Sequence, residues 1–228
     1  MTITPARLSI IMPVLNEAAG IAAALQALAP LLARGAQVVV ADGGSTDDTL
    51  ARAQACGVPV ISSTRGRAVQ MNAGAQQASG AVLLFLHADT LLPPDADQLI
   101  QQALAGPQVW GRFDVRIAGR PRLLRVIAAC MNLRSRSTGI ATGDQAMFMT
   151  RAAFDAVGGF PAQALMEDIE MSKRLLRLSR PVCLHARVVT SGRRWESCGV
   201  WRTLLLMWRL RFAYWRGAAP DQLAELYR

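Results

Sequence analysis

Short apolar runs alternate with helical segments through the first hundred residues, and this alternation constrains the fold more than any other feature. The apolar runs predict strands at 8–14, 37–42, 58–62 and 81–89. The segments near them predict helices at 17–33, 47–56, 66–78 and 95–105. Apolar strands joined by helices indicate βαβ units, in which a parallel sheet is covered by helices on both faces.

The rhythm changes after Pro107. Residues 109–117 alternate between apolar and polar side chains, which predicts a half-exposed and antiparallel strand. Further strands are expected at 145–150 and 183–189, and a helix at 166–178. We therefore expect an α/β fold whose mainly parallel sheet has a mixed edge. This domain is expected at 1–195, and a basic amphipathic helical extension at 196–228.

Composition favours a folded chain with a large core. Of 228 residues, 52% are hydrophobic and 18% are charged, which argues against disorder. No run reaches the roughly 18 apolar residues that span a bilayer. Pro13, Asn16 and Glu17 interrupt the first apolar run, so no signal peptide is expected. Four scattered cysteines are interpreted as reduced thiols, and a cytoplasmic location is expected.

The net charge of +9 is concentrated in two segments. Residues 112–136 contain seven arginines and one aspartate, and residues 187–216 contain seven arginines and one glutamate. An evenly basic nucleic-acid binder would look different, so no nucleic-acid partner is expected, although a local patch could bind phosphates. The arginines of 112–136 either flank an acidic acceptor or lipid head groups, or are solvated.

Polar residues follow each of the first four predicted strands. They are Asn16, Glu17, Asp42, Arg65, Arg67, His87 and Asp89. Ligands of open α/β sheets bind beyond the carboxyl ends of the strands, so these residues predict a binding site. Asp42 precedes two glycines that let a ligand approach the backbone, and its carboxylate could accept a nucleobase N–H. Asp47 and Asp48 suit the N-terminus of the next helix.

Two acidic positions are candidates for chemistry. Asp89 ends a very apolar strand, where one carboxylate plus substrate phosphates would suit Mg²⁺ or Mn²⁺. His87 either faces the same site or satisfies a local hydrogen bond. Glu167 and Asp168 either do chemistry or simply favour the dipole at the start of a helix. The absence of GxGxxG and P-loop motifs disfavours dinucleotide oxidoreductases and P-loop phosphotransferases.

Several motifs occur together in a recognisable order. They are Met12-Pro-Val-Leu-Asn-Glu17, Asp42-Gly-Gly-Ser-Thr-Asp-Asp-Thr49, Gly66-Arg67 through Asn72-Ala-Gly74, His87-Ala-Asp89 and Glu167-Asp168. From about Leu8 to Arg194 the chain thus resembles the family 2 inverting glycosyltransferases of the GT-A fold, a Rossmann-like nucleotide-diphospho-sugar transferase architecture. Its length and the stretch FLHADT further resemble small glycosyltransferase-like proteins associated with radical-SAM and selenodomain partners.

The resemblance implies roles for individual residues. On the donor-nucleotide side it implies Pro13, Leu15, Glu17, Asp42, Arg67, Asn72 and Ala88, with Asp42 on the base, most commonly uracil. Asp89 matches the aspartate that binds the divalent metal, and Asp168 matches the catalytic base. The acceptor side would be Gly143, Asp144, Gln145 and Glu167. His87 stands where the family has the first aspartate of Asp-x-Asp, and imidazole is a softer ligand than carboxylate.

The resemblance implies that the chain transfers a sugar from a nucleoside-diphosphate sugar, UDP-linked in the commonest case, to a hydroxyl acceptor with inversion. Two alternatives remain: a non-catalytic nucleotide-sugar-binding protein at a membrane surface, and a sugar-phosphate nucleotidyltransferase. The Gln-x-x-Arg-Trp motif of processive members is absent, and Arg193-Arg194-Trp195 is only a partial echo of it.

The segment 198–217 predicts a basic amphipathic helix. Its tryptophans recur every seven residues and each precedes an arginine, at 201–202, 208–209 and 215–216. The helix could lie on an acidic membrane, pack on its own domain with tryptophan as core, or form a seam with a second subunit. The membrane reading would suit a lipid-linked or amphiphilic acceptor and a peripheral location at the inner face of the membrane.

Overall fold

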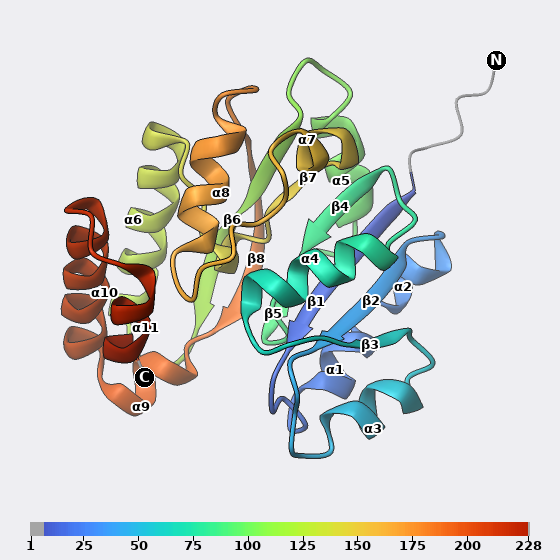
Figure 1. Cartoon of the computed structure of the whole chain (residues 1–228), viewed down its shortest axis with the longest axis horizontal. Coiled ribbons are helices and arrows are strands. Elements are labelled where there is room, and N and C mark those ends of the chain that lie inside the picture. The colour runs from blue at the N-terminus through green and yellow to red at the C-terminus, as the bar shows by residue number, and fades with distance from the viewer. Residues whose placement is uncertain (1–6, 228) are drawn as a thin grey trace.

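The sheet has eight strands within residues 7–227, the part of the chain that the computed structural model describes. In chain order they are β1 (Leu8–Val14), β2 (Gln37–Asp42), β3 (Val60–Ser62), β4 (Val82–Phe85), β5 (Thr90–Leu91), β6 (Trp110–Ala118), β7 (Phe148–Thr150) and β8 (Val182–Ser191). Across the sheet the order is β3-β2-β1-β4-β7-β6-β8-β5 (Figure 1). The strands β1 to β4 are parallel, as predicted, whereas β7 is antiparallel to β4 and β6.

Helices cover both faces of this sheet (Figure 1). They are α1 (Ile21–Gln26), α2 (Ala29–Ala33), α3 (Thr49–Ala55), α4 (Arg67–Gln77), α5 (Ala96–Ala103), α6 (Leu123–Thr138), α7 (Arg151–Ala156), α8 (Glu167–Leu175), α9 (Arg193–Cys198), α10 (Val200–Trp215) and α11 (Pro220–Tyr227). In β1, Ile10 and Met12 belong to one core cluster with residues of α1, α2, α5 and α6, while Ile11 belongs to another with residues of α4, α7 and α8. The predicted α/β architecture is confirmed.

The helix predicted at 17–33 is two helices, α1 and α2. The break coincides with Pro30, which lies in the first turn of α2. Proline has no N–H to donate to the preceding turn, so it is tolerated at the start of a helix but not inside one.

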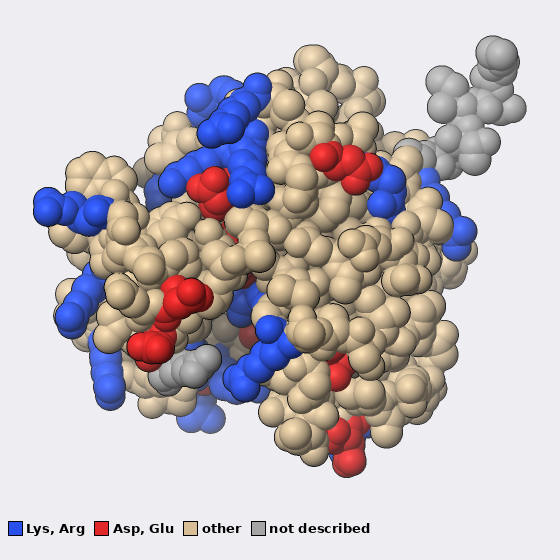
Figure 2. Space-filling view, viewed as in Figure 1, with Lys and Arg blue, Asp and Glu red and all other residues tan. Residues whose placement is uncertain are grey.

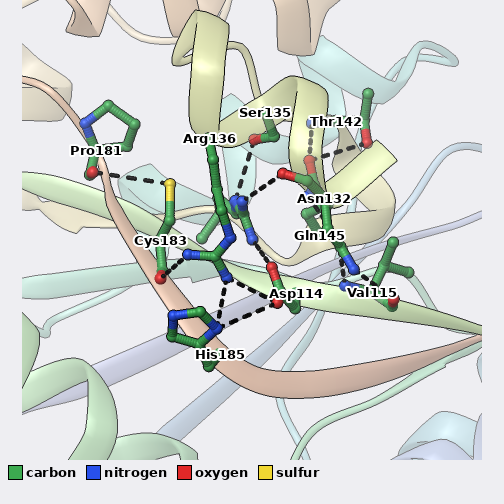
Figure 3. A network of polar contacts seen from close by, with 11 residues as sticks. Asp114, Val115, Asn132, Ser135, Arg136, Thr142, Gln145, Pro181, Cys183 and His185 are labelled. Carbon is green, nitrogen blue, oxygen red and sulfur yellow. Dashed lines mark hydrogen bonds and ion pairs between the residues drawn. The ribbon is translucent and has the colours of Figure 1, made fainter. Parts of the chain in front are cut away.

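The prediction of a half-exposed strand at 109–117 is wrong in its burial. Of the nine residues of β6, the first six and Ile117 are buried, including Arg112 and Asp114. Asp114 pairs with Arg112 and, at 2.7 Å, with Arg136 of α6 (Figure 3). These two arginines are therefore engaged within the fold, because Arg112 is fully buried and the Asp114 carboxylate pairs with both.

Two other strands are shorter than expected. The strand predicted at 81–89 ends with β4, and a turn follows in which Thr90 N–H donates to His87 O at 3.1 Å. The strand predicted at 145–150 begins only at Phe148, because Gly143–Gln145 form a 3₁₀ helix, η1. Helices α6, α7 and α9 were not predicted, whereas α10 and α11 lie within the predicted helical extension at 196–228.

The C-terminal helices pack on the domain through one face. Leu210 of α10 and Leu223 of α11 form a cluster with Met166 and Ile169, which flank the start of α8. The alternative in which tryptophan forms the core of this packing is wrong, since Trp201, Trp208 and Trp215 are exposed. No helix within residues 7–227 has the length and apolar character required to cross a bilayer.

Candidate active site

Asp42 lies at the carboxyl edge of the sheet, as predicted. The register pairs Val14 with Asp42 and Asp42 with Ser62, so the ends of β1, β2 and β3 are aligned. The carboxylate of Asp42 is buried and accepts hydrogen bonds from Gly44 N at 2.9 Å, Ser45 N at 3.0 Å and Ser45 Oγ at 2.5 Å. Asp42 therefore shapes its own turn.

The loop after β1 is tied to the loop after β2. Glu17 N donates to Thr49 Oγ1 at 2.8 Å, and Ala18 N donates to Asp47 Oδ2 at 3.1 Å. Asp47 also accepts from Thr49, whose hydroxyl is the main cause of the lowered pKa of Asp47. The Glu17 carboxylate lies 3.5 Å from Arg193, which brings α9 to this edge.

Gln70 of α4 links the ends of β1 and β2 and was not predicted from the sequence. Its buried amide donates to Val14 O at 2.7 Å and to Ala41 O at 2.8 Å. A polar residue next to Ala68 and Met71 on the inward face of α4 was the available signal.

The end of β4 brings His87 close to η1. His87 Nδ1 lies 3.4 Å from Asp144 Oδ1, and a Cβ on Gly143 would come within 2.5 Å of His87 Nε2. Although burial would raise the pKa of Asp144, the interactions with His87 and Arg67 keep it below its ordinary value. Gly143 therefore allows η1 to approach the imidazole closely.

Asp168 lies in the first turn of α8, beside η1. Its Oδ2 accepts from Gly143 N at 2.9 Å, and its Oδ1 accepts from Ile169 N at 2.7 Å. Burial and the neighbouring Glu167 carboxylate raise the pKa of Asp168 to about 6, against the opposing effect of these two N–H groups and of Arg67. A carboxylate of this pKa is ionised at neutral pH and more basic than an ordinary aspartate.

Glu167 is buried and pairs with Arg67, the first residue of α4, at 3.4 Å. A small cavity lies between α4, the end of β4, η1 and α8. Its lining consists of Arg67, Met71, Phe85, His87, Gly143, Met147, Phe160, Glu167 and Asp168. The cavity thus unites predicted residues of the donor, metal, catalytic and acceptor groups.

Other predicted residues lie elsewhere. The Asn72 amide donates to Phe160 O and accepts from Phe160 N, both at 2.9 Å, so it holds the loop before α8. Gln145 is fully buried, and its amide contacts Asn132 and Thr142 (Figure 3). Residues absent from the cavity lining also include Pro13, Leu15, Glu17, Asp42, Ala88, Asp89 and Asp144.

A second missed residue is Arg134 of α6. Within the described part of the chain, its Nε and Nη2 are buried and have no hydrogen-bond partner. Burial lowers the pKa of Arg134 even though the Asp168 carboxylate acts in the opposite direction. The sequence analysis grouped it with the other arginines of 112–136, but its helix was not predicted, so its position beside Asp168 was not expected.

Backbone strain is found around the same region. Within residues 7–227, the non-glycine residues with positive φ are Asn16 at 54°, Ala146 at 47° and Met166 at 65°. They follow β1, follow η1 and precede Glu167, respectively. Strain of this kind costs of order 1–3 kcal/mol and is concentrated at functional sites.

The donor set near Asp89 is compatible with a divalent cation held jointly with a substrate. Asp89 is half-buried, and its carboxylate contacts only the Thr90 hydroxyl, at 3.3 Å, among the contacts of the described residues. No three His, Cys, Asp or Glu side chains in that part of the chain gather as metal ligands. One carboxylate with substrate phosphates is a usual Mg²⁺ or Mn²⁺ arrangement, so Asp89 fits this role.

Solved structures share this fold. The mannosyltransferase PcManGT from Pyrobaculum calidifontis, in complex with GDP-Man and Mn²⁺, has a TM-score of 0.67 at 22% identity over 99% of this chain and 70% of its own. S. aureus TarS with UDP-GlcNAc has 0.65 at 20% identity over 81% of this chain, which spans only 58% of TarS. Glucosyl-3-phosphoglycerate synthase from Mycobacterium tuberculosis, with Mn²⁺, UDP and phosphoglyceric acid, has 0.59 at 18% identity over 81% of this chain and 69% of its own.

A comparison with curated proteins finds no match. The family described as glycosyl transferase family 2 matches residues 9–157, which is well over half of the chain and includes β1 to β7, α4 and η1. The chain belongs to glycosyl transferase family 2 and is a glycosyltransferase of the GT-A fold.

Proposed function

We propose that the chain transfers a sugar from a nucleoside-diphosphate sugar, UDP-linked, to a hydroxyl acceptor with inversion at the anomeric carbon. The observation that carries the proposal is the cavity in which Asp168, with a pKa of about 6, lies beside Glu167, Arg67 and His87. A basic carboxylate next to a cation and an imidazole suits proton removal beside a phosphate leaving group.

On the donor side, we propose that Pro13, Leu15, Glu17, Asp42 and Ala88 line the nucleotide pocket. The Asp42 carboxylate has about four acceptor positions, and the hydrogen bonds from Gly44 and Ser45 leave capacity for one base N–H. Asn72 acts through Phe160, whose backbone it holds against the cavity. Arg67 stabilises negative charge on the diphosphate.

We propose that Asp89 holds a divalent cation, Mg²⁺ or Mn²⁺, on the diphosphate, with His87 as a possible second ligand. The bound cation would supply neutralisation of the charge that develops on the leaving group. PcManGT and the synthase are each in complex with Mn²⁺, which supports the same choice of cation here.

In the proposed reaction, the acceptor oxygen bonds to the anomeric carbon while the bond from that carbon to the donor phosphate breaks. The acceptor proton passes to an oxygen of Asp168, and the bonding electrons leave with the nucleoside diphosphate. The hydrogen bonds from Gly143 N and Ile169 N orient the carboxylate for this transfer. One displacement from the opposite face inverts the anomeric centre.

The acceptor would enter past Gly143, Asp144, Gln145 and Glu167, with Gln145 shaping η1 from within. A lipid-linked or amphiphilic hydroxyl compound is the acceptor class we propose. Supporting it, α10 and α11 pack against Met166 and Ile169, on either side of Glu167 and Asp168. In this proposal residues 1–195 form the transferase domain, 196–228 form the extension, and the protein is cytoplasmic at the inner face of a membrane.

The finer resemblance to glycosyltransferase-like proteins associated with radical-SAM and selenodomain partners rests only on length and the stretch 85–90. A non-catalytic nucleotide-sugar-binding protein and a sugar-phosphate nucleotidyltransferase remain the competing functions. The basic carboxylate at Asp168 favours transfer over mere binding.

The first test is thermal unfolding with UDP, GDP and their sugar conjugates, each with and without Mn²⁺. A ligand at a hundredfold excess over its Kd stabilises the folded state by about 2.7 kcal/mol. We expect Mn²⁺-dependent stabilisation by UDP that is lost in Asp89→Asn and retained in the matched control Asp95→Asn. The absence of stabilisation by every nucleotide would contradict the proposed donor site.

Catalysis is tested separately by hydrolysis of the stabilising sugar nucleotide, with water as a slow substitute for the acceptor. NMR of the released sugar should show the anomer opposite to that of the donor. Retention of configuration, or binding without any turnover, would contradict inverting transfer.

A further inference from the structure

An exposed apolar stripe runs along α10. Its members are Trp201, Leu205, Trp208, Phe212 and Trp215, and their side chains are between 61% and 77% exposed. Spacings of four and three residues place all five on one side of a helix. Large aromatic side chains normally bury most of their surface, so this stripe needs a partner.

The opposite side of α10 already has its partner. Thr203 and Leu210 are buried, and Leu206, Met207 and Tyr214 are partly buried against α8 and α11. The helix therefore packs on the domain through this side, and the exposed stripe faces outward.

The exposed stripe is bordered by positive charge. Arg202, Arg209 and Arg216 are exposed and follow successive tryptophans along the helix. No acidic residue occurs between Glu196 and Asp221, and Figure 2 shows basic side chains spaced along the edge of the molecule that α10 forms. The partner should therefore offer an apolar region that can bury the stripe, together with negative charge that can pair with the arginines.

The neighbouring helix α6 adds to this character. Figure 1 places α6 and α10 next to each other, and Leu123 and Leu204 pack against the same core cluster. Among residues 7–227, seven of the eleven exposed large hydrophobic side chains lie on these two helices, and Val126 and Leu133 are the two on α6. An open hollow before and at the start of α6 is lined by Arg116, Arg120, Arg122 and Arg125.

We propose that α10 docks in the plane of an anionic bilayer surface, with the exposed stripe below the head groups and the arginines among the lipid phosphates. Tryptophan and arginine are the side chains that suit this boundary, because each joins an apolar body to a polar end. With sixteen residues, α10 is about 24 Å long, which is enough to lie on a bilayer but short of the length for a span.

Charge excludes a second copy of the chain as the partner. Pairing two α10 helices through the exposed stripe would bring Arg209, Arg211 and Arg216 of both copies to the flanks of the seam. Stable seams place opposite charges at these positions, and α10 has no acidic residue to supply them.

The test is co-sedimentation of the full chain with vesicles of phosphatidylcholine alone or with 30% phosphatidylglycerol, in the absence of any nucleotide. We expect binding to the anionic vesicles that weakens at high salt, together with a blue shift of tryptophan fluorescence. Arginines near such a surface each contribute about fivefold, so R202Q/R209Q/R216Q should bind about a hundredfold more weakly. The matched control R7Q/R52Q/R177Q changes three other exposed arginines and should bind like the wild type.

A second variant, Trp208→Ser with Trp215→Ser, tests the apolar contribution and should lose both the binding and the fluorescence shift. Its control is Leu91→Ser with Leu178→Ser, two exposed apolar positions outside α6 and α10. Circular dichroism verifies that each variant is folded. Equal binding of the wild type and the arginine variant, or a dimer in light scattering that the tryptophan variant dissociates, would overturn the proposal. Because the assay contains no donor, its outcome is independent of the proposed transfer reaction.

Discussion

The main-chain N–H of Gly143 donates a 2.9 Å hydrogen bond to Oδ2 of Asp168, across 25 residues of sequence. The same glycine lies against His87, where a Cβ would come within 2.5 Å of Nε2. One backbone position thus sets the distance between the imidazole after β4 and the carboxylate at the start of α8. The η1 helix therefore positions His87 on one side of the cavity and Asp168 on the other.

Replacing Asp168 by asparagine should remove the proton acceptor. We expect donor turnover to fall by about 10²- to 10⁴-fold, the usual contribution of a general base, while the Kd for the sugar nucleotide stays within about twofold. Turnover is measured by nucleotide release and binding by calorimetry. Glu170→Gln, which changes a carboxylate of the same helix that pairs with Lys173 and Arg174, is the control and should retain activity. Equal losses of binding and turnover in Asp168→Asn would rule out the assignment as base.

The raised pKa of Asp168 predicts the acid side of the pH–rate profile. The base acts when deprotonated, so kcat/KM should fall tenfold per pH unit below about 6 and level off above it. Glu167→Gln removes one of the two causes of the raised pKa of Asp168 and leaves burial as the other. The acid limb of the profile should therefore move to lower pH. Rates between pH 4.5 and 8.5 provide the measurement. A limb near pH 4 in the wild type would contradict the proposed role.

Alanine at position 143 should disturb the cavity without unfolding the chain. Its Cβ would overlap the His87 ring, so either the ring or η1 must move and the bond to Asp168 lengthens. Misplacement of a catalytic group by about 1 Å can cost roughly a hundredfold in rate. Gly20→Ala is the control, because a Cβ there meets nothing within 4 Å. Steady-state kinetics beside thermal unfolding would separate the two effects, and unchanged kinetics in Gly143→Ala would contradict the prediction.

Asp114→Asn should destabilise the fold strongly. It would leave the fully buried Arg112, and Arg136 beside it, without a compensating carboxylate (Figure 3). Breaking a buried pair in this way typically costs about 3–5 kcal/mol. Asp97→Asn breaks the more exposed pair with Arg34 and should cost about 0–1 kcal/mol. Urea unfolding gives both values, and similar costs for the two variants would contradict a structural role for the network.

The parallel half of the sheet can be predicted from the chain's local patterns alone. Its four strands are contiguous apolar runs, and the placement of Asp42 at the end of β2 and of His87 just after β4 follows from chain order. The order of the motifs indicated the family, which the match over residues 9–157 confirms. The pair Glu167-Asp168 lies at a helix start, as expected. These features are local, because strand, turn and helix start are each encoded within about ten residues.

Long-range packing determines which polar side chains are free to bind a ligand and which are already hydrogen-bonded within the fold. Asn72 is engaged by Phe160, 88 residues away, and Arg112 finds Asp114 and Ser135 in a buried network. Packing likewise buries Leu210 of α10 and leaves Trp208 exposed. Alternation and helical periodicity show which residues share a face of a strand or helix. Which face is buried depends on what packs against it, and those contacts join residues that are distant in the chain.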